Sequence, residues 1–126
     1  MKRPHILRSA IKKAARNAFD AERALAWTPD NPVCRRTHAR AVARVERAIY
    51  QAQRERLIPL PTVQALLGIV LDAQTLARLR ITGKQSVPPG TSTGYWDTLD
   101  AMDRAIDRAW RRARLTRVFT RSGGIQ

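Results

Sequence analysis

The feature that most constrains the fold is a run of apolar residues at helical spacing near the start of the chain. They recur three or four positions apart, and they are Leu7, Ile11, Ala14, Ala18, Ala21 and Leu25. Residues at this spacing line one face of an α-helix, so we predict a helix over residues 5–27. Half of the stripe is alanine, which lets another helix approach closely and is compatible with a homodimer.

A turn with two prolines separates this helix from a second apolar stripe. The turn is TPDNP at residues 28–32, in which Asn31 can cap the next helix and Pro32 suits its first position. The second stripe predicts a helix over residues 32–57. Because the connection is short, we expect the first two helices to form an antiparallel hairpin.

The third apolar segment is broader than the first two. LIPLPT at residues 57–62 breaks the chain, and the apolar residues that follow predict a deeply buried helix over residues 62–82. Within it, LLGIVL at residues 66–71 is the longest apolar run, and a strand there is the alternative. This run is far too short to span a bilayer.

The last third of the chain begins with a segment that cannot be regular structure. Residues 83–94 contain two prolines and three glycines, which predicts a long flexible loop. Apolar spacing then predicts a fourth helix over residues 95–114, and the tail at residues 122–126 is expected to be frayed. We therefore predict an all-α fold for residues 1–126: one domain, a four-helix antiparallel bundle with an N-terminal helical hairpin and a longer loop before the last helix.

The net charge of this chain is unusually high. It is +14, from 24 basic and 10 acidic residues, and twenty of the basic residues are arginine. Such self-repulsion is better tolerated when an anionic partner relieves it. Arginine also binds phosphate and carboxylate through paired hydrogen bonds and stacks on bases, although codons rich in G and C would produce the same skew. Nucleic acid or an acidic protein surface is the expected partner, and a membrane is not, because the basic faces lack a free apolar face opposite them.

Arginines dominate the outer faces of the second and fourth predicted helices. At about 100° per residue they fall on the side away from each apolar stripe. The candidate residues for binding nucleic acid or another partner are Arg36, Arg40, Arg47 and Arg54 in the second helix and Arg104, Arg108, Arg111, Arg112, Arg114 and Arg117 in the fourth.

Charges in the fourth helix are segregated along its length. Acids occupy its start and arginines the rest, an order that suits the helix dipole. Spacing of four positions also pairs Asp100 with Arg104 and Asp107 with Arg111. These effects leave a surplus of arginines, because Asp103 and Asp107 can neutralise only some of them.

Aromatic residues accompany the arginines. Phe19 and Tyr50 sit in the similar segments RNAFDAER and RAIYQAQR, where they either stack on bases or pack at the edge of the core. Trp96 and Trp110 are of the type that anchors protein interfaces. Tyr50, Trp96 and Trp110 are thus the candidates for stacking or anchoring.

The apolar stripe of the fourth helix is lost after Ala113. Leu115, Val118 and Phe119 would lie opposite the stripe if the helix continued. We expect the chain to bend after Ala113 and bury them, and the alternative is that they form a contact surface for a partner.

Few residues suggest chemistry. Cys34 and His38 share a helix face and could form half of a nucleophilic dyad, but a buried thiol beside a core-edge histidine is the simpler interpretation. Two acidic pairs could in principle hold Mg²⁺: Asp97 with Asp100, and Asp103 with Asp107. We predict no catalytic residue, cofactor or metal site. A single cysteine excludes an intrachain disulfide and favours the cytoplasm.

The sequence thus predicts a non-catalytic protein that binds DNA or RNA through backbone phosphates, with little reading of bases. A phage- or plasmid-encoded accessory factor would have this character. The alternative is a small adaptor or inhibitor that docks on an acidic surface of a host protein or nucleoprotein complex.

Overall fold

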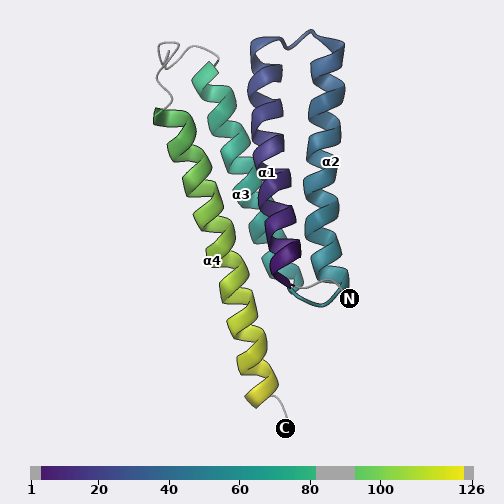
Figure 1. Cartoon of the computed structure of the whole chain (residues 1–126), viewed down its shortest axis with the longest axis vertical. Helices are drawn as coiled ribbons and strands as arrows, with labels where there is room; N and C mark the ends of the chain where they lie inside the picture. Colours follow the sequence, from purple (N-terminus) through teal and green to yellow (C-terminus); the bar gives the residue numbers. More distant parts are fainter. Residues whose placement is uncertain (1–3, 82–92, 124–126) are drawn as a thin grey trace.

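The computed structural model describes the backbone of residues 4–81 and 93–123 and the side chains of residues 4–78 and 96–115. Four α-helices account for nearly all of the described backbone, which contains no strand: α1 (Pro4–Trp27), α2 (Pro32–Arg54), α3 (Leu60–Ile81) and α4 (Thr93–Gly123). Consecutive helices run in opposite directions, and both ends of the chain lie at one end of the bundle (Figure 1). The predicted all-α antiparallel bundle is confirmed. The alternative strand is wrong, since that segment lies inside α3.

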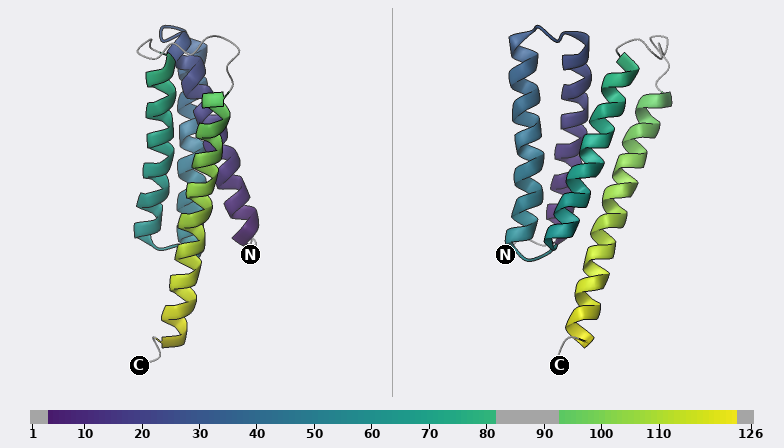
Figure 2. Two further views of the ribbon diagram at one scale, coloured as in Figure 1. Left: turned by 90° about the vertical axis from the view of Figure 1, so that its left-hand side faces the viewer. Right: turned by 180° about the vertical axis from the view of Figure 1, so that it is seen from behind.

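The helices are arranged with α1 and α3 at the centre. Each of these two contacts the three other helices, whereas no contact joins α2 to α4 among the described residues. Figures 1 and 2 show α2 on one side of this central pair and α4 on the other. The outer faces of α2 and α4 therefore belong to different sides of the molecule.

The turn between α1 and α2 is built as its residue types predict. The Asn31 side chain accepts hydrogen bonds from the backbone N–H groups of Val33 at 2.9 Å and Cys34 at 3.3 Å. Pro32 occupies the first turn of α2, where it sacrifices no helical hydrogen bond. The predicted cap is confirmed.

The connection between α2 and α3 differs from the prediction. α2 ends at Arg54 and not at 57, because Arg56 adopts a left-handed backbone conformation with φ of 60°. This turn directs Leu57 and Ile58 into the core, where both are buried. α3 then begins at Leu60, two residues earlier than expected.

The core is a single cluster to which all four helices contribute. Four residues of the α1 stripe are buried inside the bundle, namely Leu7, Ile11, Ala18 and Ala21, whereas Ala14 and Leu25 are half-buried. α3 is only partly covered, because Leu60, Leu71 and Leu76 are exposed on its outer side. By length and composition alone, the segment Leu60–Arg78 could cross a membrane, but core helices of water-soluble bundles share this composition.

The last helix is longer than predicted. α4 continues to Gly123 without a bend at Ala113 and runs past the ends of the other helices (Figures 1 and 2). No glycine or proline occurs between Tyr95 and Ser122 to stop it. Leu115 is 64% exposed, so the predicted burial of this residue is wrong. The side chains of Val118 and Phe119 lie outside the described residues, as do residues 82–92 of the predicted loop and residues 124–126 of the tail.

Candidate nucleic-acid interface

Two aspartates of α4 are paired with α1. Arg16 Nη2 donates to Asp103 Oδ2 at 2.8 Å, and Lys12 Nζ donates to Asp107 Oδ2 at 3.1 Å. Arg8 Nε lies 3.8 Å from the second oxygen of Asp107. These ion pairs join the first helix to the last and use acids that lie in the middle of the arginine-rich helix.

This pairing corrects the expectation of charge pairs within α4. Among the described residues, Asp107 makes its ion pairs with α1 and none with Arg111. Arg104 Nε donates to the backbone carbonyl of Asp100 at 3.3 Å and forms no ion pair with its carboxylate. Both predicted pairs are therefore wrong, and the α4 arginines are less neutralised than their spacing suggests.

A third acid is engaged in the interior. Glu22 on α1 is 3% exposed, and its carboxylate accepts a hydrogen bond from Arg78 Nε of α3 at 2.7 Å. Its other oxygen lies 2.5 Å from His38 Nε2 of α2, and the two groups form an ion pair when the imidazole is protonated. One buried carboxylate thus connects three helices.

The arginines predicted on α2 are all exposed: Arg36, Arg40, Arg47 and Arg54. Arg47 Nε donates weakly to the carbonyl of Ala43 at 3.4 Å. Among the side chains that the structure describes, at residues 4–78 and 96–115, none of the four forms an ion pair with a carboxylate. This face therefore presents uncompensated positive charge along the whole helix.

A polar groove lies beside this face, between α1 and α2. It encloses about 300 Å³ and is lined by Arg40 and Arg44 together with the side chains of Asn17 and Thr37. Guanidinium, amide and hydroxyl groups are the side-chain donors that most often bind phosphate oxygens. Ala21 of α1 and Ala41 of α2 also line the groove. Because their side chains are small, they leave room for the polar side chains of both helices to converge on one hollow.

Arg44, Asn17 and Thr37 are absent from the residues predicted from sequence. Arg44 lies four positions after Arg40 and three before Arg47, so helical spacing alone could have included it. Asn17 and Thr37 carry no such signal, because their proximity depends on how α1 and α2 are aligned.

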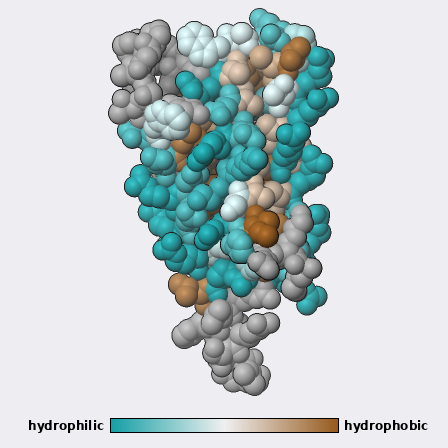
Figure 3. Space-filling model, in the orientation of Figure 1, coloured by the Kyte–Doolittle hydropathy of each residue, from teal (hydrophilic) through white to brown (hydrophobic). Residues whose placement is uncertain are grey.

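The predicted arginines of α4 are also at the surface. Arg104, Arg108, Arg111 and Arg112 are exposed and Arg114 is half-buried, while the side chain of Arg117 lies outside the described residues. These residues do not join the arginines of α2, because α1 lies between the two helices (Figure 1). The face toward the viewer in that orientation is largely hydrophilic, with a narrow apolar strip over α1 (Figure 3). The positive charge thus forms two separate faces.

The aromatic candidates divide into core and surface. Tyr50 and Trp96 are exposed and available to a partner. Trp110 is only 4% exposed, and Phe19 is buried as well, so neither can stack on a base. The prediction for Trp110 is wrong because it follows Ile106 by four positions and shares its inward face.

The polar groups that suggested chemistry have structural partners. Thr28 Oγ1 lies within hydrogen-bonding distance of Cys34 Sγ, 3.2 Å away, and His38 contacts Glu22. In the part of the chain that the structure describes, no three residues of the type His, Cys, Asp or Glu are grouped to hold a metal ion.

No model of a known protein family matches this chain, and no curated protein or solved structure gives a significant match to it. Inferences about function therefore rest on geometry and charge.

Proposed function

We propose that this protein is a non-catalytic nucleic-acid-binding protein whose exposed arginines contact backbone phosphates. The observation that carries the proposal is the α2 face, where Arg36, Arg40, Arg47 and Arg54 are exposed without an acidic partner among the described residues. The groove that Arg40 and Arg44 share with polar groups of both helices adds a concave site for a phosphate.

The distribution of acids supports this proposal. Asp103, Asp107 and Glu22 are paired with cations of other helices, so these three carboxylates hold the bundle together. They are correspondingly less able to neutralise the surface arginines. Most arginines with described side chains are exposed, so an anionic polymer can approach their charge.

The spacing of the α2 arginines suits a backbone rather than a base sequence. Arg36 and Arg54 are separated by about 27 Å along the helix at 1.5 Å per residue. A duplex of that length presents on the order of 16 phosphates. Contacts to phosphates position a protein without reading sequence, while exposed Tyr50 offers a ring on which an unpaired base can stack. We therefore expect binding to DNA or RNA with little base preference.

Paired variants on α2 test this proposal. Arg40→Gln removes a groove cation, whereas Arg35→Gln removes a cation that already pairs with Asp30 and the Pro29 carbonyl. We expect Arg40→Gln to weaken binding of a short labelled duplex or single strand by on the order of tenfold at 50 mM salt. Arg35→Gln should have a much smaller effect. Equal effects of the two variants would show that only net charge matters and that the groove is not a site.

A second candidate function is docking on an acidic protein surface. Exposed Trp96 on α4 favours it, because tryptophan and arginine commonly anchor protein interfaces. A pull-down in which the partner survives nuclease treatment would support this alternative. A partner that is lost together with the nucleic acid would support the first proposal.

A further inference from the structure

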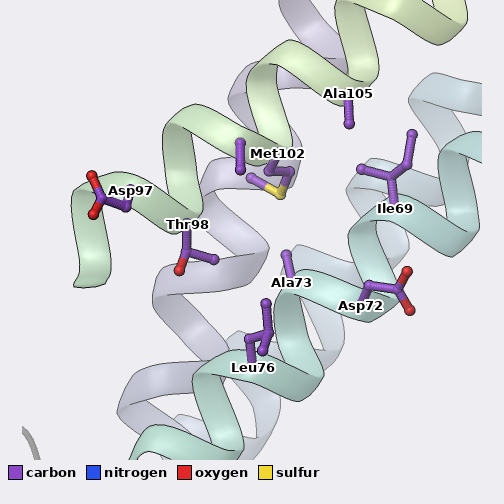
Figure 4. A pocket seen from close by; sticks show the side chains of 9 residues that line it. Ile69, Asp72, Ala73, Leu76, Asp97, Thr98, Met102 and Ala105 are labelled. Atoms are coloured by element: carbon purple, nitrogen blue, oxygen red, sulfur yellow. The ribbon is translucent and has the colours of Figure 1, made fainter. Parts of the chain in front are cut away.

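A second hollow lies between α3 and α4, away from the arginine groove. It encloses about 360 Å³, and Ile69, Leu76 and Met102 contribute its large apolar side chains (Figure 4). Alanines of both helices complete the apolar lining. Asp72 and Asp97 are the charged residues that line it, one from each helix.

The charge of this hollow is opposite to that of the chain. Among the described residues that line it, at positions 69–76 and 97–105, both charged side chains are acidic. In a protein with a net charge of +14, such a place is unusual. An apolar hollow with carboxylates beside it is complementary to a helix that combines apolar side chains with cations.

The end of α4 is a helix of that composition. Beyond Ala113 it carries Arg114, Arg117 and Arg121, and it projects past the other helices (Figure 2). Leu115 is exposed near its base, and the sequence places further apolar residues three and four positions later. We call residues 114–123 the tip; by spacing, its apolar residues share one helix face.

The tip cannot reach the hollow of its own chain. α4 is one continuous helix from Thr93 to Gly123, and its residues at the hollow lie near Ala101. The middle of the tip is about 26 Å further along the same rod at 1.5 Å per residue. Only a second molecule can bring a tip to the hollow.

We propose that two copies of this chain associate in an antiparallel pair, in which the tip of each copy occupies the α3–α4 hollow of the other. The distance from hollow to tip is the same in both copies, so a two-fold axis lets both contacts form at once. The basic tip helix would then lie beside Asp72 and Asp97 of the other copy, with its exposed Leu115 against the apolar lining of the hollow. This inference does not depend on nucleic-acid binding.

The same arrangement brings Arg108 and Arg112 of the two copies toward the axis, because by helical spacing they share the face of α4 that carries Ala101 and Ala105. Their repulsion and the net charge of each chain oppose association at low ionic strength. We therefore expect the pair to form best at about 0.5 M salt, where screening limits charge effects to a few ångströms and the apolar contacts remain.

Mixing two variants tests the proposal. Leu115→Glu disables the tip, and Ala101→Arg places a cation in the hollow; both positions are exposed, so the bundle should stay folded. Sedimentation equilibrium of nuclease-treated protein should show a dimer for the wild type and a Kd raised more than about tenfold for each variant alone. An equal mixture should regain dimer, because the intact tip of Ala101→Arg can enter the intact hollow of Leu115→Glu.

A matched control is Leu71→Glu, which alters an exposed apolar residue of α3 outside the hollow and should leave the dimer intact. Circular dichroism confirms that each variant is folded. A monomeric wild type at 0.5 M salt, dimers unchanged in both variants, or no recovery on mixing would each overturn the proposal. Loss of the dimer in Leu71→Glu alone would place the contact on the outer face of α3 and would overturn it as well.

Discussion

Lys12 of α1 donates a hydrogen bond to Asp107 of α4 at 3.1 Å, across 95 positions of the chain. Helical spacing within α4 pairs the same aspartate with Arg111. The observed partner lies on another helix, and the arginine is left exposed. One contact therefore both joins the first helix to the last and leaves a surface arginine uncompensated.

Replacing Asp107 with asparagine separates these two effects. We expect Asp107→Asn to lower the free energy of unfolding by about 1 kcal/mol, because its ion pairs are partly exposed to solvent. Urea denaturation measures this loss. Binding of nucleic acid should be unchanged or slightly tighter, because the variant is one charge more positive. Weaker binding by a fully folded variant would contradict the assignment of Asp107 to the contact between α1 and α4.

Glu22 is expected to matter more than any other carboxylate of the described residues. Glu22→Gln leaves Arg78 and His38 without their shared anion, at a cost of about 3 kcal/mol. The estimate is at the low end for a buried pair because Arg78 itself is largely exposed. The control is Glu46→Gln on the surface of α2, which should shift the urea midpoint little. Equal shifts for the two variants would argue against the three-helix contact.

The Asn31 cap makes a smaller and separable contribution. Asn31→Ala removes the acceptor for two backbone N–H groups at the start of α2 and should cost about 1 kcal/mol. Asn31→Asp retains an acceptor oxygen and should restore most of the loss. The changes in the free energy of unfolding of both variants are obtained from urea denaturation midpoints, with the dependence of that free energy on urea concentration unchanged between variants. A variant with aspartate as unstable as the one with alanine would contradict the capping role.

Replacing each of the two tryptophans of α4 with alanine should change the stability of the bundle by very different amounts. Trp110→Ala opens a cavity in the core and should destabilise the bundle by about 3–5 kcal/mol. Trp96→Ala removes a ring that is 54% exposed and should destabilise the bundle by about 1 kcal/mol. Thermal unfolding followed by circular dichroism distinguishes the two. A Trp96 variant as unstable as the Trp110 variant would contradict the orientation of α4.

Local patterns in the sequence account for most of the architecture. The stripe from Leu7 to Leu25 predicted α1, and Asn31 with Pro32 predicted the start of α2. These features depend on residues within a few turns of one another, where helical spacing and capping operate. α4 is longer than predicted because the loss of an apolar stripe does not by itself end a helix, and Leu115 and the arginines around it are good helix formers.

The contacts between helices cannot be predicted from local patterns in the sequence. Spacing within one helix cannot show that Asp107 faces Lys12, or that Asn17 lies beside Arg44, because both depend on the alignment of separate helices. Burial of Trp110 is a different case: its aromatic size suits an interface, but its position four residues after Ile106 already places it on the inward face. The candidate arginines were found from sequence, but the groove that gathers two of them was not.

The central proposal is that exposed arginines bind phosphates, and the salt dependence of affinity tests it most directly. We predict that the logarithm of the association constant for a random duplex falls linearly with the logarithm of salt concentration between about 50 and 200 mM. The slope should be about −4 to −5 if the arginines of the α2 face and its groove each contact a phosphate. The double variant Arg40→Gln/Arg44→Gln should make the slope shallower by about 2. A wild-type slope near zero, or a slope unaltered in the double variant, would contradict the account.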